Sequence, residues 1–231
     1  MKRYFRNAAA VVMFAAASFS CGAVRPDWIN YEKYETANQE LKNMPDNGKR
    51  VVFFGNSITE FWASRRPFFQ NNGFIGRGIS GQTTYQFLSR FREDVVELHP
   101  AVVVINAGTN DVAENTHAFN PRRTIGNIKS MVEIARANGI KIILTTTLPS
   151  ASFGWNKTIT DAPEKISALN KELKAYAAQE DIPFVDYFSA VVADDGRAID
   201  PACSSDGVHP NDEGYSRMEA LILPVVKKVL E

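Results

Sequence analysis

Apolar residues occur in short runs that alternate with amphipathic stretches from residue 51 onward. Such runs, bounded by polar residues, are typical of strands buried on both faces of a sheet; they span residues 51–54, 74–79, 102–106, 141–147 and 184–187. Apolar residues at helical spacing predict helices over residues 84–98, 121–138, 162–179 and 212–230. Strand–helix alternation of this length predicts an α/β fold with one parallel sheet covered by helices on both faces.

A further helix is predicted ahead of the first strand. Aromatic and apolar residues recur at helical spacing over residues 31–41, and the Pro-Asp-Asn-Gly turn at residues 45–48 separates them from the strand. No repeat, low-complexity stretch or linker divides the chain, and its 231 residues suffice for one sizeable core. We therefore expect residues 24–231 to form a single domain.

Residues 1–23 have the pattern of an export signal. Lys2, Arg3 and Arg6 precede an apolar run over residues 8–17, which is too short to span a membrane, and small residues follow. Cleavage after Ser20 would release a secreted protein. Alternatively, Cys21 is lipidated and attaches the protein to a membrane, which we favour because a lone cysteine at this boundary otherwise lacks a purpose. The expected location is the periplasm or cell envelope, or else outside the cell.

Charge and composition narrow the expected partners. The chain has 26 basic and 26 acidic residues, with no basic stripe, so nucleic acid is not an expected partner. Its 45% hydrophobic residues suit a globular domain. No Cys/His cluster or carboxylate set has convincing ligand spacing, although Asp111 and Asp206 loosely suggest one. We expect neither a metal nor another cofactor.

The first predicted strand runs directly into a serine. Gly55 permits a sharp turn at the end of the strand, Asn56 is a good helix N-cap, and Ser57 then begins a helix at the edge where α/β proteins bind ligands. A hydroxyl there can act as a nucleophile beside backbone N–H groups. Taken alone, the segment is more often a simple helix cap.

A serine nucleophile needs a base, and the chain has three histidines. His99 is expected at the edge of the sheet opposite to Ser57. His117 is a reserve candidate in a loop at the same edge as Ser57. His209 follows Asp206 by three residues, with Gly207 allowing a tight turn. The carboxylate can accept the histidine Nδ1–H and leave Nε2 to face the serine. The pair is weak evidence by itself.

Two other strand ends supply hydrogen-bond donors for a developing oxyanion. Gly81 follows the second strand and can bring its backbone N–H close, and Asn110 follows the third strand and offers a side-chain amide. Each has a commoner explanation, a turn for Gly81 and a loop cap for Asn110. Gly81 and Asn110 occur together with Ser57 and with the Asp206–His209 pair, each group at its own junction. This joint occurrence favours acyl-transfer chemistry.

These four segments resemble the sequence blocks of the SGNH hydrolases, also called GDSL-type esterases and lipases. The blocks read GNSIT at residues 55–59, RGISGQTT at 77–84, GTND at 108–111 and DGVHP at 206–210. The resemblance spans nearly all of the chain after the signal, and it is closest to the branch of the platelet-activating-factor acetylhydrolase catalytic subunits and bacterial carbohydrate acetylesterases. One position departs from the family pattern: Asn56 stands where the family usually has aspartate.

The resemblance implies a serine esterase with a three-layer α/β/α, flavodoxin-like fold and a five-stranded parallel sheet. It implies Ser57 as nucleophile and His209 as base, oriented by Asp206. The implied oxyanion hole consists of the Ser57 and Gly81 N–H groups and the Asn110 side chain.

The expected substrate is a small-molecule or glycan ester of a short acyl group, with acetyl as the favoured one. Trp155 lies in a Gly/Ser-containing loop at the functional edge and is a candidate substrate contact, as is Asp111. The sequence contains no long apolar lid segment, which disfavours a lipase for long-chain triglycerides. A lysophospholipase or thioesterase is the nearest enzymatic alternative, and a non-catalytic carbohydrate-binding protein is the alternative of another class.

Overall fold

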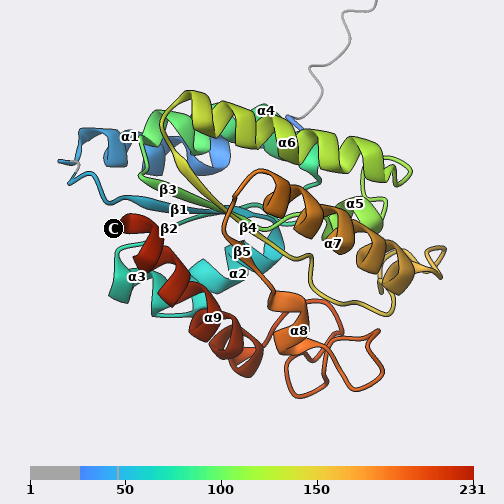
Figure 1. Cartoon of the computed structure of the whole chain (residues 1–231). Helices are drawn as coiled ribbons and strands as arrows, with labels where there is room; N and C mark the ends of the chain where they lie inside the picture. Colours follow the sequence, from blue (N-terminus) through green and yellow to red (C-terminus); the bar gives the residue numbers. More distant parts are fainter. Residues whose placement is uncertain (1–26, 46) are drawn as a thin grey trace, which may run out of the picture.

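Five parallel strands form the centre of the molecule in the order β2-β1-β3-β4-β5 (Figure 1). The computed structural model describes residues 27–45 and 47–231, so the predicted export signal and Cys21 lie outside the described residues. The strands are β1 (Val51–Gly55), β2 (Ile75–Gly78), β3 (Val102–Ile105), β4 (Lys141–Thr145) and β5 (Phe184–Val185). The predicted α/β fold with a five-stranded parallel sheet is confirmed.

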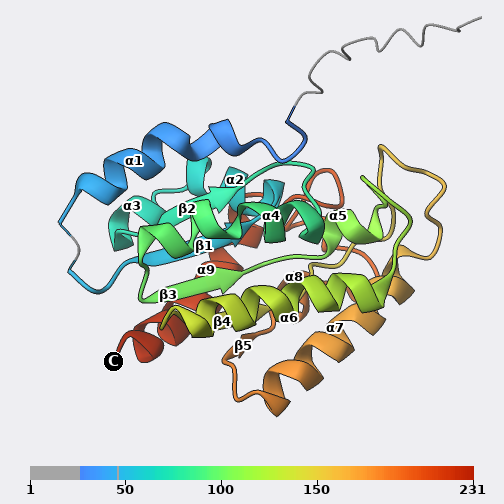
Figure 2. The ribbon, with the colours of Figure 1, turned by 90° about the horizontal axis from the view of Figure 1, so that it is seen from above.

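Helices cover both faces of the sheet, which gives the three-layer, flavodoxin-like arrangement. Figure 2 shows α4 (Thr84–Asp94), α6 (Pro121–Ala137) and α7 (Ala162–Gln179) over one face. The opposite face carries α2 (Ser57–Arg65), α3 (Phe68–Asn72), α8 (Tyr187–Val191) and α9 (Asp212–Leu230). The remaining helices are η1 (Tyr31–Tyr34), α1 (Glu35–Asn43), η2 (Val96–Leu98) and α5 (Thr109–Val112). Across residues 27–45 and 47–231, none of these helices has the length and apolar character needed to cross a membrane.

The buried strands supply apolar side chains to both layers. Val52 and Phe54 belong to the core beneath α4, α6 and α7, whereas Val51 and Phe53 belong to the core beneath α2, α3 and α9. This alternation follows from the two-residue period of a strand, and it explains why the sequence of β1 is apolar at consecutive positions.

The predicted helix over residues 84–98 is wrong in its length. Helix α4 ends at Asp94, the backbone of Val95 leaves the helical region at φ −131°, and the short helix η2 follows. His99 then adopts a left-handed conformation at φ 49°, which turns the chain towards β3. Helices α3, α5 and α8 are too short for a periodic pattern to reveal them.

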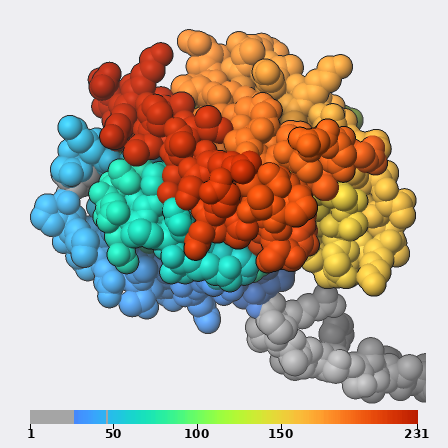
Figure 3. Space-filling model, turned by 90° about the horizontal axis from the view of Figure 1, so that it is seen from below, coloured from blue at the N-terminus to red at the C-terminus, as the bar shows by residue number. Residues whose placement is uncertain are grey.

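Helix α2 is fixed to α9, although more than 140 residues separate them in the sequence. The Trp62 ring stacks on Tyr215 with centroids 5.5 Å apart, and its Nε1 donates to Glu219 at 2.9 Å. The Tyr215 hydroxyl donates to the carbonyl of Ile58 at 2.8 Å. Figure 3 shows α9 lying beside α2 and α3 on this face. The contacts set the start of α2 against the loop that precedes α9.

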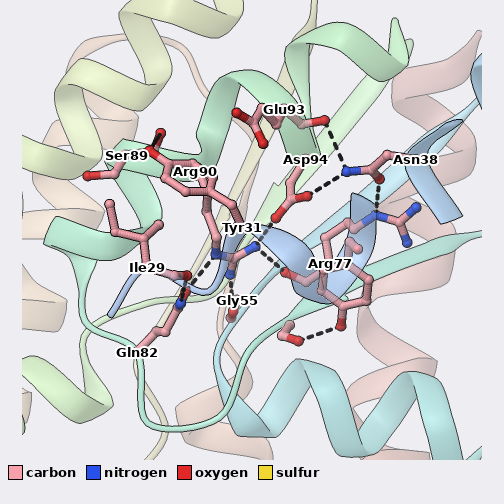
Figure 4. Close-up of polar contacts among 12 residues, drawn as sticks. Ile29, Tyr31, Asn38, Gly55, Arg77, Gln82, Ser89, Arg90, Glu93 and Asp94 are labelled. Carbon is pink, nitrogen blue, oxygen red and sulfur yellow. Dashed lines mark hydrogen bonds and ion pairs between the residues drawn. The ribbon is translucent and has the colours of Figure 1, made fainter. Parts of the chain in front are cut away.

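Arg90 is a fully buried cation beneath the carboxyl ends of β1 and β2 (Figure 4). Its guanidinium donates to the carbonyl of Gly55 at 2.8 Å and to that of Arg77 at 3.1 Å. It also donates to the side chain of Gln82 at 2.6 Å and pairs with Asp94 at 2.7 Å. Burial lowers the pKa of Arg90, and the charge of Asp94 opposes that effect. Arg90 therefore joins two strand ends and the loop after β2.

The N-terminal segment completes this buried network. From α1, Asn38 donates to Asp94 at 2.7 Å and accepts from Arg77 at 2.8 Å. The Gln82 side chain, which Arg90 holds from below, donates to the carbonyl of Ile29. The segment before β1 is thus bonded to the loop that follows β2, since a buried polar cluster is stable only when its groups are paired.

Replacing Arg90 by methionine is expected to lower the free energy of unfolding by about 3–5 kcal/mol, because it leaves a buried carboxylate at Asp94 without its cation. Urea unfolding monitored by circular dichroism measures the change. The exposed Arg92→Ala on the same helix is the control and should stay within about 0.5 kcal/mol of the wild type. An Arg90→Met protein as stable as that control would contradict the role assigned to the cluster.

Candidate active site

A serine, a histidine and an aspartate form one hydrogen-bonded chain at the carboxyl edge of the sheet. The Ser57 Oγ lies 2.9 Å from the His209 Nε2, and the His209 Nδ1 lies 2.7 Å from the Asp206 Oδ2. Ser57 begins α2, where the Asn56 side chain accepts from the N–H of Ile58 at 3.0 Å and caps the helix. Asparagine thus provides the cap without the negative charge that aspartate would add.

Hydrogen bonds within the turn at residues 206–209 hold the Asp206 carboxylate in the orientation that contacts the imidazole. Asp206 Oδ1 accepts from the backbone N–H groups of Val208 at 2.9 Å and His209 at 2.8 Å, and Gly207, directly after Asp206, adopts φ +77°. Ser204 Oγ adds a third bond to the same oxygen at 3.1 Å. Burial opposes ionisation of Asp206, but the bonds from His209 and Val208 outweigh it and lower the pKa to about 2.

Three N–H donors are candidates to bind an oxyanion formed next to the Ser57 hydroxyl. The backbone N–H of Ser57 is at the first position of a helix, where no intrahelical acceptor exists. Gly81 adopts φ +77°, a conformation that favours glycine, in the loop after β2. Asn110, at the start of α5, donates one amide hydrogen to the carbonyl of Gln82 at 2.9 Å. Its amide carries a second hydrogen, because an NH₂ group has two donors.

A cavity of about 290 Å³ lies over this group. Its lining includes Ser57, Gly81, Asn110 and His209, which the sequence placed at separate junctions, and the predicted substrate contact Trp155. Phe61, Ser80 and Asn115 complete the lining. These three were missed by sequence reasoning. Ser80 stands inside the second sequence block, which was a usable signal, but Phe61 and Asn115 carry no pattern.

Asn115 connects the tryptophan to the loop after β2. Its Nδ2 donates to the carbonyl of Gly81 at 3.0 Å, and its Oδ1 accepts from the Trp155 Nε1 at 2.8 Å. Glu114, directly before it, adopts φ 58°, which is uncommon for a residue other than glycine. Trp155 remains 51% exposed, with one edge held and the rest of the ring open to a ligand.

The structure places Asp111 away from the cavity, so its predicted substrate contact is corrected. The side chain is 1% exposed and accepts from the Thr84 N–H at 3.0 Å. It also accepts from the Thr84 hydroxyl at 2.5 Å and from the Thr124 hydroxyl at 3.1 Å. Burial raises its pKa, and these bonds offset part of that rise. Asp111 therefore holds α4 and α6 to α5, because a buried carboxylate needs every oxygen bonded.

Neither of the other histidines reaches Ser57. His117 bonds through Nδ1 to Thr116 Oγ1 at 2.7 Å and packs on the Tyr85 ring, outside the catalytic cavity. His99 follows η2 and precedes the amino end of β3, whereas Ser57 follows the carboxyl end of β1. Across residues 27–45 and 47–231, no group of three or more His, Cys, Asp or Glu side chains is arranged to hold a metal ion.

Comparison with known proteins agrees with the fold and shows the family. The profile of the GDSL-like lipase/acylhydrolase family matches residues 53–217. The Esterase TesA of Pseudomonas aeruginosa is 29% identical over 156 residues, which cover 68% of this chain and 70% of that protein. An acetylxylan esterase of Xylanibacter ruminicola is 26% identical over an alignment of 246 residues, covering 87% of this chain and 48% of that protein.

A solved structure from Bacteroides fragilis, described as that of a candidate acylhydrolase, is 60% identical to this chain. The match covers 89% of this chain and 99% of that one, with a TM-score of 0.87. The family match over residues 53–217 includes all four sequence blocks.

Asp206→Asn removes a carboxylate whose pKa is lowered to about 2 in the folded protein, from an ordinary 3.8. Such a group stabilises the fold above pH about 4, and the contribution is lost as the pH falls through about 2. The wild type should exceed the variant in unfolding free energy at neutral pH by less than about 1 kcal/mol, because the side chain is half exposed.

Urea unfolding between pH 7 and pH 3 measures the difference, which should shrink below pH about 4. A difference that grows on acidification would mean that the turn does not stabilise the ionised form of Asp206.

Proposed function

Because this chain belongs to the GDSL-like lipase/acylhydrolase family and is an ester-bond hydrolase, we propose that it removes short acyl groups, acetyl above all, from carbohydrate esters. The observation that carries the proposal is the Ser57–His209–Asp206 chain of hydrogen bonds, 2.9 Å and 2.7 Å long, at the floor of a small cavity. The mechanism is that of a serine esterase.

Acylation begins at the Ser57 hydroxyl. His209 Nε2 accepts the hydroxyl proton while Oγ attacks the ester carbonyl carbon, and the 2.9 Å separation is within the range for such a transfer. Asp206 holds the imidazole in the tautomer with the proton on Nδ1 and stabilises the imidazolium that forms. Because hydrogen bonds lower the pKa of Asp206 to about 2, its carboxylate is ionised at neutral pH.

The negative charge of the tetrahedral intermediate develops on the carbonyl oxygen. The N–H groups of Ser57 and Gly81 and the second amide hydrogen of Asn110 stabilise that charge. Two of these donors are held in place before substrate arrives. Asn115 bonds the Gly81 carbonyl, and the Gln82 carbonyl orients the Asn110 amide. Donors that need not reorganise contribute more to the rate.

The intermediate collapses when His209 returns the proton to the leaving alcohol. Water then enters beside the acyl-enzyme, His209 accepts one of its protons, and the same donors stabilise the second oxyanion. The second intermediate collapses with cleavage of its bond to Oγ, His209 returns the proton to Ser57, and the carboxylic acid leaves.

Cavity size and lining support a short acyl group on a sugar. A volume of about 290 Å³ is at the lower end of the usual range for small-molecule sites. Trp155 presents an exposed ring whose Nε1 is already bonded to Asn115, and apolar ring faces pack well on sugar rings. The similarity to an acetylxylan esterase supports the same substrate class.

Ser57→Ala tests the nucleophile against the alternative of a non-catalytic binding protein. We expect hydrolysis of p-nitrophenyl acetate to fall about 10⁴-fold or more, because no other group takes over the attack. Adding His209→Ala to this variant should cause little further loss, since the two residues act as one unit. An unchanged melting temperature is the control for folding. Equal rates in wild type and Ser57→Ala would overturn the serine mechanism.

A series of p-nitrophenyl esters tests the acyl length. The wild type should prefer acetate over octanoate in kcat/KM by at least about tenfold, because the small cavity gives no space for a long chain. The same ranking is expected for acetylated against octanoylated methyl glycosides. A preference for octanoyl esters would instead favour a lysophospholipase or thioesterase.

A further inference from the structure

Arg65 is an exposed cation beside the catalytic cavity. Its guanidinium carbon lies 4.1 Å from the centroid of the Phe61 ring, and it makes no hydrogen bond or ion pair to any residue in the ranges 27–45 and 47–231. The adjacent Arg66 differs, because it pairs with Glu219 at 3.0 Å and with Asp212 at 3.4 Å. Arg65 is thus held in place by an aromatic ring while its donors remain available.

Phe61 connects Arg65 to the catalytic histidine. Its ring lines the cavity and lies 5.1 Å, centroid to centroid, from the imidazole of His209. Ser57, Phe61 and Arg65 are spaced four residues apart on α2, so they occupy one face of the helix. The order across the site is therefore serine and histidine, then a ring, then a guanidinium.

This side of the cavity receives the alcohol portion of the ester. His209 must protonate the leaving oxygen, so the alcohol lies next to the imidazole. The oxyanion donors Gly81 and Asn110 belong to the loop after β2 and to the start of α5, whereas Phe61 and Arg65 lie on α2, one and two turns beyond the Ser57 N–H. A group carried by the alcohol would meet Phe61 first and Arg65 beyond it.

We propose that Arg65 binds a carboxylate on the alcohol portion, and that the substrate is an acetyl ester of an acidic sugar such as a uronic acid. The inference rests on the proposed carbohydrate esterase function. A planar guanidinium presents parallel N–H bonds that match a carboxylate, and stacking on Phe61 limits the orientations that it must lose on binding. The Phe61 ring offers an apolar surface to the sugar between the two charges.

Arg65 also has a structural explanation that the test must separate. It is the last residue of α2, where a cation stabilises the helix dipole, and its charge lowers the pKa of the nearby Tyr215, which burial raises more strongly. Both effects are independent of the charge of the substrate. A substrate-dependent change in rate is therefore the required readout.

The experiment compares two substrates that differ only in charge, an acetylated methyl glucoside and the matching acetylated methyl glucuronide. At low salt the wild type should favour the glucuronide in kcat/KM by about fivefold to tenfold, and Arg65→Gln should abolish that preference while changing the glucoside rate less than about twofold. Raising the ionic strength to 0.5 M should reduce the wild-type preference. Arg65→Lys, which keeps the charge, should retain part of it.

Arg92→Gln, an exposed position on α4 across the sheet, is the matched control and should leave the preference intact. A wild type that hydrolyses the glucoside at least as fast as the glucuronide would overturn the Arg65 proposal alone. A wild type that hydrolyses p-nitrophenyl acetate but neither sugar would overturn the carbohydrate function and the acidic-sugar proposal with it. A third outcome is that acetylated glycerol phosphate is hydrolysed faster than acetylated glycerol, while the glucuronide is not hydrolysed faster than the glucoside. That result would overturn the acidic-sugar proposal and favour a phospholipid-like ester.

Discussion

The hydrogen bonds of one buried guanidinium, that of Arg90, hold together the edge of the sheet that carries the candidate active site. They reach the carbonyl of Gly55, two residues before Ser57, and the side chain of Gln82, whose own carbonyl orients Asn110. A cation without water must satisfy all of its donors, so its acceptors cannot move independently. The positions of Ser57 and Asn110 therefore both depend on the same buried guanidinium.

A second constraint comes from the opposite face of the sheet. The loop that carries His209 is placed by α9, and α9 is placed on α2 by the stack of Trp62 on Tyr215 and by the bond from Tyr215 to Ile58. Ser57 and His209 are 152 residues apart in sequence, yet their side chains come within 2.9 Å. Aromatic packing of this kind stabilises the fold and sets the geometry of the reaction at once.

Much of the candidate site was predictable because its chemistry is local. Asp206, Gly207 and His209 form their turn within four residues, and Asn56 caps the helix that Ser57 begins. Phe61, Arg65 and Asn115 were not predictable, because their roles depend on neighbours from other segments. Asn115 acts on Gly81 and Trp155, which are 34 and 40 residues away. The prediction for Asp111 was wrong for a related reason. Its carboxylate was expected to face the ligand because it follows Asn110, but it is buried and accepts three hydrogen bonds from Thr84 and Thr124.

By itself, the sequence determined the α/β alternation, the parallel five-stranded sheet and the four junctions that carry the reactive groups, because strand and helix periods and turn residues act over a few positions. It did not determine the end of α4 at Asp94, where the Val95 backbone leaves the helical region and the short helix η2 follows. Only the tertiary structure decided which side chains line the cavity and which are buried behind it. A side chain's surroundings depend on elements that pack from distant parts of the chain, and periodicity contains no information about them.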